Sequence, residues 1–296
     1  MTTTKASGGV AAALKEPGIE AGAVRDLCPG IRRVTAPNPG VMTGPGTNTY
    51  LVGEREVAVI DPGPAHQGHL ETVLGASGRK IRWILVTHTH PDHSPGAAFL
   101  KAATRAEVIG LRPPRGGSQD QSFAPDRVMD DGELIQAGEF SLRAVHTPGH
   151  ASNHLCFLHE EEQLLFTGDH IKQDSTVVIA PPDGDMAVYL DSLRRLLALP
   201  MKGLAPGHGK LMGEPRKVVE WFIAHRLARE EKVMGSLLGF EVATPEDLLP
   251  LVYDDVPSFL HPVAIHSLRA HLIKLERDGR VSLREGRWQA LSGRVT

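Results

Sequence analysis

The stretch His88-Thr89-His90-Pro91-Asp92-His93 decides how the rest of this chain is interpreted. It follows an apolar run over 81–87, which is typical of a fully buried strand. At the end of a strand, His88 and His90 lie two residues apart, so their side chains point the same way. Pro91 is favoured at the first position of a helix, which predicts that the following Asp and His lie in the first helical turn. One short segment therefore directs three imidazoles and a carboxylate into one small volume.

The chemistry of this segment predicts a metal site. Imidazole and carboxylate suit zinc, manganese and iron, and four such groups exceed what one tetrahedral catalytic zinc takes. The surplus predicts two metal ions. Without a cation, the cluster would be penalised by several kcal/mol of desolvation and repulsion. Three later segments repeat the setting of a strand end with a glycine turn, and their candidate ligands are His150, Asp169 and His208.

The overall composition narrows the function classes. The 296 residues are 41% hydrophobic and 23% charged, which is ordinary for a globular protein and too apolar for a disordered one. A formal net charge of −3 predicts no strong general attraction to nucleic acid or to anionic membranes. Fifteen histidines stand against three Trp and three Tyr, which indicates that imidazole has a chemical use here.

Cysteine content and apolar runs predict the compartment. Two cysteines, Cys28 and Cys156, exclude a disulfide framework and a cysteine-based zinc site, and they favour a reducing compartment. The apolar run over 83–86 is far shorter than the roughly 20 residues of a membrane span. The run over 10–14 is too short for a signal-peptide core and lacks a basic flank. We therefore expect a cytoplasmic protein that makes no membrane contact.

Changes in composition and residue pattern along the sequence divide the chain into three parts. Residues 1–25 are rich in Ala, Gly and Thr, which predicts a flexible N-terminal arm. Residues 26–214 alternate strand-like and helix-like runs and predict one α/β domain, while residues 215–296 form a separate part. In the α/β domain, strands are predicted over 31–35, 47–52, 57–60, 81–87, 107–110, 140–146, 155–159 and 163–167, and helices over 66–74, 95–103 and 186–199.

The last part has the element order of a winged helix. A long helix over 215–238 is followed by helices over 245–252 and 262–277, a turn at Asp278-Gly279, and two short strands over 281–284 and 287–291. Helix, helix and two-stranded hairpin in that order predict a small winged-helix domain.

On these motifs, the chain resembles the metallo-β-lactamase-fold hydrolases. The resemblance covers about residues 30–210 and rests on motifs that occur in the same order as in that family. These are Asp61 within Val59-Ile60-Asp61-Pro62-Gly63, the His88–His93 cluster, His150, Asp169 and His208. The resemblance implies a four-layer αββα sandwich with the site at one edge of its two sheets.

The resemblance also implies a ligand set. His88, His90 and His150 would hold one metal ion, Asp92, His93 and His208 would hold the other, and Asp169 would bridge them together with a water or hydroxide. Asp61 would orient the site, so Asp92, Asp169 and Asp61 are the predicted catalytic carboxylates. The implied cofactors are two divalent ions, with Zn²⁺ expected and Fe or Mn as alternatives.

The predicted reaction is hydrolysis by the metal-bridging hydroxide. Two metals lower the pKa of a shared water toward 7 and polarise the bond that is attacked. We expect a small-molecule ester, namely a thioester, lactone or other carboxylic ester. Asn48, His154 and Thr176 are the candidate substrate contacts. The glyoxalase II branch shares the ligands, but its glutathione-binding region has no match in this sequence.

A second hypothesis is phosphodiester cleavage. Residues 42–50 and 271–279 resemble the lactamase-like subfamily with a C-terminal winged helix, which includes an animal mitochondrial endoribonuclease. That resemblance implies an endoribonuclease of single-stranded RNA assisted by the winged helix. Residues 241–296, however, carry seven Lys or Arg against eight Asp or Glu, a weak balance for a nucleic-acid module. We therefore favour a packing or homo-oligomerisation role for this domain.

A third hypothesis is a non-catalytic metal-binding or oxygen-sensing protein. The flavodiiron branch uses the same cluster with iron, but normally carries a Glu in place of one His and a fused flavin domain. Here His90 is intact and no flavin domain follows. This hypothesis ranks below both hydrolases.

Overall fold

The computed structural model describes residues 9–15, 18–173 and 175–291. It divides the chain into two compact units that do not follow the sequence order. The first unit holds residues 1–147, 153–177 and 198–218. The second holds 148–152, 178–197 and 219–296.

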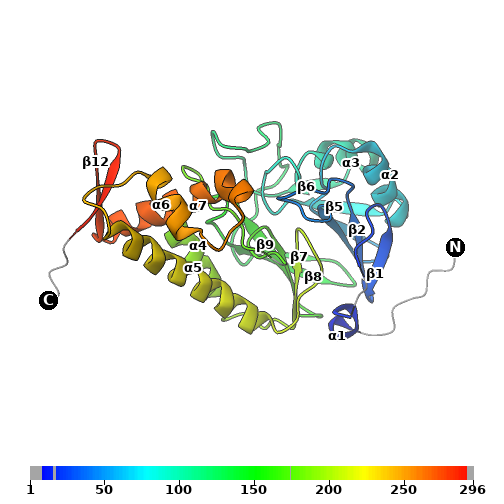
Figure 1. Cartoon of the computed structure of the whole chain (residues 1–296). Coiled ribbons are helices and arrows are strands. Elements are labelled where there is room, and N and C mark those ends of the chain that lie inside the picture. The colour runs from blue at the N-terminus through cyan, green and yellow to red at the C-terminus, as the bar shows by residue number, and fades with distance from the viewer. Residues whose placement is uncertain (1–8, 16–17, 174, 292–296) are drawn as a thin grey trace. The chain divides into compact units, whose positions relative to one another are not determined.

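The first sheet has six strands in sequence order, β1 to β6 (Figure 1). Its first four strands pair antiparallel, and the last three pair parallel. Every residue of β3 and β4 is buried, including the polar Asn48 and Thr49 at the start of β3, whereas β4 is wholly apolar. The strands are β1 (Val24–Cys28), β2 (Ile31–Thr35), β3 (Asn48–Val52), β4 (Val57–Ile60), β5 (Ile81–Leu85) and β6 (Glu107–Ile109).

The second sheet has five strands in the order β11-β10-β9-β8-β7. The pairs from β7 to β10 are antiparallel, and β11 joins β10 in parallel. β9 and β10 are buried along their whole length, so their apolar runs fit central strands. The strands are β7 (Leu134–Gln136), β8 (Ser141–His146), β9 (Leu155–His159), β10 (Leu164–Gly168) and β11 (Gly203–Pro206).

Side chains from both sheets form the main core. Tyr50 packs against Phe166 with ring centroids 5.0 Å apart, and Trp83 meets Phe140 edge-on at 6.1 Å. The other face of the first sheet packs against helices α2 (Gln67–Ala76) and α3 (Gly96–Thr104) (Figure 1). The α/β prediction is confirmed: two mixed sheets are flanked by helices, and the first unit holds three of the four expected layers.

The N-terminal residues depart from the predicted flexible arm. Helix α1 spans Val10–Ala13, and the side chains of Val10 and Ala13 are buried in the core between the sheets. The strand β1 then begins at Val24, inside the predicted arm. Residues 1–8 and 16–17 of that prediction lie outside the described residues. The short α1 was overlooked because a single turn shows no full apolar period.

The second unit contains the predicted winged helix. Its core includes residues of α5, α6, α7 and the hairpin, and Val233, Leu268 and Trp288 are buried there. The order helix, helix, hairpin is confirmed. The elements are α4 (Met186–Leu196), α5 (Pro215–Leu237), α6 (Pro245–Val252), the 3₁₀ turn η1 (Ser258–Leu260), α7 (His261–Arg277), β12 (Val281–Arg284) and β13 (Arg287–Ala290).

The second unit also takes in two segments of the predicted 26–214 domain. Asp185 caps α4 and pairs with Arg277 of α7, while the Ile179 N–H donates to Ser267 Oγ at 3.1 Å. The Asp185 N–H donates to the Gly149 carbonyl oxygen at 2.8 Å. These contacts tie 148–152 and 178–197 to α7, which a boundary read along the sequence does not reveal.

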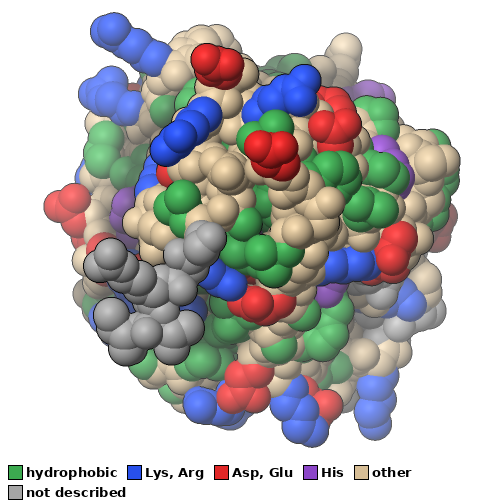
Figure 2. Space-filling view, turned by 60° about the vertical axis from the view of Figure 1, so that its left-hand side comes forward, with side chains coloured by type: hydrophobic (Ala, Val, Ile, Leu, Met, Phe, Trp, Pro, Cys, Tyr) green, Lys and Arg blue, Asp and Glu red, His purple; other side chains and the backbone are tan. Residues whose placement is uncertain are grey.

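Two surface properties bear on partners. Among the described residues, none of the helices has both the length and the apolar character to span a membrane. On the face shown in Figure 2, basic and acidic side chains are interspersed rather than segregated by sign. That face therefore presents no continuous positive field for a nucleic-acid backbone.

Candidate metal centre

The His/Asp cluster follows β5, as predicted, but it occupies a turn. The His93 N–H donates to the His90 carbonyl oxygen at 3.0 Å, and α3 begins only at Gly96. A second proline explains the delay, because the residue before Pro95 is pushed away from helical geometry. The prediction that Pro91 opens a helix is therefore wrong. The turn, rather than a helix, places the carboxylate and the third histidine.

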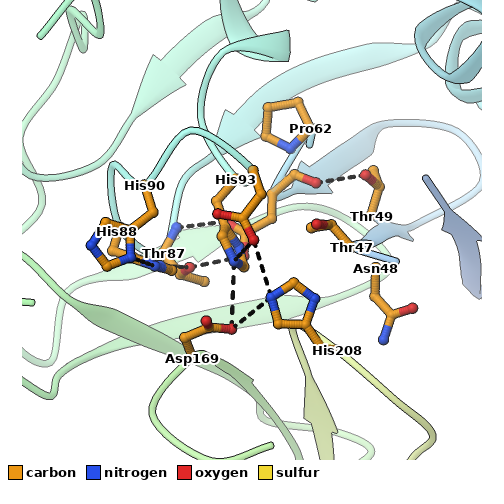
Figure 3. Close-up of polar contacts among 12 residues, drawn as sticks. Thr47, Asn48, Thr49, Pro62, Thr87, His88, His90, His93, Asp169 and His208 are labelled. Carbon is orange, nitrogen blue, oxygen red and sulfur yellow. Dashed lines mark hydrogen bonds and ion pairs between the residues drawn. The ribbon is translucent and has the colours of Figure 1, made fainter. Parts of the chain in front are cut away.

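Four ligand-type atoms meet within the first unit (Figure 3). His208 Nε2 lies 3.2 Å from Asp92 Oδ2 and 3.3 Å from Asp169 Oδ1. His93 Nε2 lies 3.4 Å from each of the same two oxygens. A tetrahedral zinc site with ligand distances of about 2.1 Å has ligand atoms about 3.4 Å apart. The spacing of these four atoms therefore fits the edges of a metal-coordination tetrahedron.

A buried carboxylate fixes the orientation of His93. Asp61 follows β4 and is 2% exposed. Its two oxygens accept hydrogen bonds from the Thr87 N–H and from Thr87 Oγ1, both at 2.8 Å, and Oδ2 lies 2.9 Å from His93 Nδ1. The Nδ1–H donates to Asp61, which leaves the lone pair on Nε2. That Nε2 is buried and has no hydrogen-bond partner among the described residues, as expected of a metal ligand.

Backbone contacts hold the opposite side of the cluster. His208 Nδ1 lies 3.2 Å from the Gly46 carbonyl oxygen, so Nδ1 donates and Nε2 faces the carboxylates. The Asp169 N–H donates to His154 Nε2 at 3.2 Å, and His154 Nδ1 contacts Thr147 Oγ1 at 2.9 Å. His154 is fully buried. Its contacts support Asp169, and the role of His154 as a substrate contact stays a prediction.

Burial and opposite charges shift the titration of the cluster. Burial opposes ionisation of Asp169, but His208 and His93 outweigh it and hold its pKa well below the usual range. Burial also disfavours protonated His208, yet Asp169 and Asp92 outweigh this and raise its pKa to about 9. The metal-free cluster therefore has protonated imidazoles where a divalent cation would otherwise balance the carboxylates.

A second group of ligand atoms extends the cluster. Within the first unit, ligand atoms of His88, His93 and Asp169 lie within 4.8 Å of one another. His88 Nε2 and His90 Nδ1 are 2.9 Å apart. His150 belongs to the second unit, where its Nδ1 contacts the Val178 carbonyl oxygen at 2.6 Å. The role of His150 as third ligand to the His88 and His90 metal stays a prediction.

Close approach at this edge requires glycine. A Cβ at Gly207 would lie 2.8 Å from His93 Cε1 and 2.9 Å from Asp169 Oδ1. Gly168, at φ +47°, would place a Cβ 2.6 Å from Thr87 Oγ1. Gly168, the last residue of β10, and Gly207, directly after β11, thus let these strand ends approach the cluster, which explains the glycine at these two strand ends.

Asn48 stabilises the His208 loop. It is fully buried, and its Nδ2 donates to the Pro206 and Gly209 carbonyl oxygens at 2.9 and 2.8 Å. Its Oδ1 accepts from Thr35 Oγ1 at 2.8 Å. These bonds give the amide a structural role, and the role of Asn48 as a substrate contact stays a prediction. Thr176, the third predicted contact, is half-buried beside the cavity residue Ser175.

Some residues of the site were absent from the prediction. Thr87 binds Asp61 through both its N–H and its hydroxyl, and its place directly before the His cluster was the only available signal. A cavity of about 390 Å³ lies beside His208 and is lined in part by Lys172 and Lys210. Neither lysine belongs to a motif, so only the fold reveals that both line the cavity.

The two cysteines take no part in this chemistry. Cys28 and Cys156 are both free and buried, and burial raises the pKa of each thiol to about 12. A thiol with so high a pKa is neither a ready nucleophile nor a ready metal ligand. This agrees with the prediction of a site built from imidazoles and carboxylates.

Two family models match the chain. Residues 42–208 match the Metallo-beta-lactamase superfamily, and residues 244–288 match the Beta-lactamase associated winged helix domain. The first match includes every predicted ligand, and the second spans α6, α7 and most of the hairpin.

Similar proteins match this chain along most of its length. The chain is 33% identical over 278 residues to "Beta-lactamase-like protein 2 homolog" of Drosophila melanogaster, covering 88% of this chain and 92% of that protein. It is 32% identical over 292 residues to "Atrochrysone carboxyl ACP thioesterase" of Aspergillus chevalieri, covering 92% and 90%. A crystal structure of a metallo-beta-lactamase family protein from Thermus thermophilus superposes with a TM-score of 0.75 at 25% identity, covering 90% of this chain and all of that one.

Proposed function

Because the chain belongs to the metallo-β-lactamase superfamily and is a hydrolase of that fold, we propose that it is a dinuclear metal-dependent thioesterase. The observation that carries the proposal is the four-atom cluster of Asp92, His93, Asp169 and His208, whose spacing fits a metal ion. The reaction class is supported by the fungal relative that is named a thioesterase and matches along most of both chains.

The proposed ligand set fills two metal sites. Asp92, His93 and His208 would hold one divalent ion, His88, His90 and His150 would hold a second, and Asp169 would be shared by both. Zn²⁺ is the proposed metal because His and carboxylate ligands suit it, and Fe and Mn are the alternatives. When bound, the two ions supply a nucleophilic water at neutral pH and polarise the scissile carbonyl.

The surrounding residues fix which ring nitrogen of His93 and of His208 faces the cluster. Asp61 holds the proton on His93 Nδ1, and the Gly46 carbonyl holds the proton on His208 Nδ1. Both Nε2 atoms are thereby directed into the cluster. The Asp92 side chain is 26% exposed, whereas that of Asp169 is 13% exposed. Asp92 thus lies on the more solvent-accessible side of the cluster.

A nuclease role has less support. The proposed thioester reaction needs only the cavity and the cluster, whereas RNA cleavage needs a basic track for the phosphate backbone. The interspersed charges of the face in Figure 2 do not provide such a basic track there.

We propose a small-molecule substrate and a homo-oligomer formed through the C-terminal domain. A truncated variant that ends near residue 238 lacks the winged-helix domain. If this domain forms the homo-oligomer, the truncated variant should have the mass of a monomer in solution, whereas the full chain should not.

One activity panel tests the proposal. Protein reconstituted separately with Zn²⁺, Fe²⁺ and Mn²⁺ is offered butyryl thioesters, a lactone, bis-p-nitrophenyl phosphate and short single-stranded RNA. We expect hydrolysis of the thioesters that is lost in Asp169→Ala. Turnover of RNA or of the phosphodiester, with thioesters intact, would overturn the proposal in favour of the nuclease.

A further inference from the structure

The loop that carries His150 belongs to the second unit and is fastened to α4. Ser192 Oγ of α4 donates to the Pro148 carbonyl oxygen at 2.7 Å. A Cβ at Gly149 would lie 2.3 Å from the Cα of Tyr189, so the loop packs directly on this helix. α4 in turn lies beside α7 of the winged helix (Figure 1). These contacts fix the backbone of the loop within the second unit.

One peptide group, which joins Val178 to Ile179, fixes the ring of His150. His150 Nδ1 lies 2.6 Å from the Val178 carbonyl oxygen. A carbonyl oxygen only accepts, so the proton is on Nδ1 and the lone pair of the neutral ring is on Nε2. A histidine that binds a metal ion through Nε2 needs this tautomer, and a backbone carbonyl is one of the groups that commonly fix it.

The other side of the same peptide group is held by Ser267 of α7. The Ile179 N–H donates to Ser267 Oγ at 3.1 Å. Ile179 is fully buried, and Ser267 is 5% exposed. Because the N–H and the carbonyl point in opposite directions across one planar peptide group, a bond at the N–H helps to decide where the carbonyl points. Ser267 therefore acts on the orientation of His150 through this peptide group.

The hydroxyl of Ser267 is unexpected on the buried face of α7. Its buried neighbours on this helix include Leu268 and Leu272, and alanine would favour the helix more than serine does. A buried hydroxyl also loses contact with water, which costs free energy unless the group is hydrogen-bonded. The Ile179 N–H supplies that bond, so the peptide group that the serine holds accounts for its presence.

We propose that Ser267 is a positioning residue of the metal centre, which fixes the orientation and tautomer of His150 through the peptide group between Val178 and Ile179. The winged-helix domain thereby takes part in holding a metal ion. That His150 binds a metal ion rests on the proposed function. The orientation of His150 by Ser267 rests only on contacts within the second unit.

The proton on His150 Nδ1 tests the orientation. With or without bound metal, a proton held in this 2.6 Å bond should give a downfield proton NMR signal that exchanges slowly with water. Loss of the signal in His150→Ala assigns it. Ser267→Ala should shift the signal upfield and speed its exchange about 3- to 10-fold, which corresponds to one hydrogen bond. Ser77→Ala is the control, because Ser77 is also buried and bonds a backbone carbonyl, that of Leu74, but lies in the first unit.

Metal affinity tests the consequence for the metal centre. Calorimetric titration of the metal-free full chain with Zn²⁺ should resolve two binding events. Ser267→Ala should weaken one event about 3- to 10-fold and leave the other unchanged. The weakened event should be the one that His150→Ala abolishes. In a chain that already carries His150→Ala, adding Ser267→Ala should change metal affinity no further, because changes that act through one group are not additive.

Each result decides the proposal. It is overturned if the His150 signal is the same in Ser267→Ala as in wild type, or if Ser77→Ala has the same effects. It is also overturned if Ser267→Ala alters neither binding event, weakens both equally, or still lowers affinity in the His150→Ala chain. A His150 signal that responds to Ser267→Ala in a protein that binds no metal ion would overturn the proposed function and leave the orientation of His150 by Ser267 standing.

Discussion

Asp61 Oδ2 lies 2.9 Å from His93 Nδ1, and this contact decides which nitrogen of His93 faces the two carboxylates of the cluster. Both residues are almost fully buried, since Asp61 is 2% and His93 0% exposed. Water therefore does not take the place of either partner in this contact. The carboxylate thus acts on metal binding through the histidine, without touching the ion itself.

Changing Asp61 to Asn should weaken metal binding while leaving the fold intact. Asn keeps the shape and tolerates the positive φ of 51° at this position, whereas Ala would add backbone strain. Loss of the negative charge should lower metal affinity about 10- to 100-fold, measured by competition with a chromophoric chelator. Asp126→Asn, at an exposed site, is the control. Unchanged affinity in Asp61→Asn would show that Asp61 does not orient His93.

Removing a ligand should have a larger effect. Asp169→Ala and His90→Ala should each lose most of the bound metal. Activity should fall by more than about 100-fold, which is the upper range for residues that only orient a metal ligand. Metal content is measured by elemental analysis after dialysis, and folding by circular dichroism. Full activity of a metal-depleted protein carrying both changes would contradict the dinuclear mechanism.

Metal binding should release protons near neutral pH. The pKa of His208 in the metal-free protein is raised to about 9, because Asp169 and Asp92 outweigh the effect of burial. A metal ion needs the neutral imidazole, so uptake at pH 7 expels that proton and affinity should rise with pH up to about 9. Titration calorimetry in buffers of different ionisation enthalpy measures the release. If the observed binding enthalpy is the same in all buffers, metal binding does not remove a proton from His208.

The metal-free protein should lose stability as the pH rises from neutral. A His with a raised folded-state pKa stabilises the fold fully below its unfolded pKa of about 6.5. That contribution is lost as the pH passes through about 9. Asp169, with its depressed pKa, acts in the opposite direction and loses its contribution only as the pH falls into the acid range. Melting curves with chelator should therefore decline above pH 6.5, and saturating metal should remove the decline.

Asn48→Ala should affect stability before it affects substrate binding. The change leaves the Pro206 and Gly209 carbonyl oxygens without their buried donor, which should reduce the free energy of unfolding by about 2–3 kcal/mol. Urea unfolding of the metal-free protein measures this. A raised KM at unchanged stability would instead restore Asn48 as a substrate contact.

The sequence predicted those parts of the fold whose signal is local. The apolar runs of β2, β4 and β9 and the winged-helix order were predicted with correct bounds or nearly so. Strands β7 and β11 were missed because three or four residues carry too little periodicity to separate from a loop. Helix α3 was predicted to within one residue of its start, but the helical turn predicted after Pro91 is a non-helical turn, because a proline at the first position of a helix and one in a turn look the same in the sequence.

The residues of the candidate site likewise fall into those with a local sequence motif and those that only the fold brings together. Asp92, His93, Asp169 and His208 were predicted from motifs, and the structure brings their ligand atoms together. The hydrogen bonds of Asn48 could not be predicted, because an Asn in a turn-rich segment looks the same whether it binds a substrate or, as here, carbonyl oxygens 158 and 161 residues further along the chain. Lys172 was not part of any predicted motif, and only the fold shows that it lines the cavity beside His208.

The buried thiols have a practical consequence. A thioesterase is followed most simply by counting released thiol with a disulfide dye, and most proteins add their own cysteines to that signal. Here both cysteines are buried and have pKa values raised to about 12, so the folded chain should be silent in such an assay. The same silence means that any slow appearance of thiol signal without substrate reports the opening of the core itself.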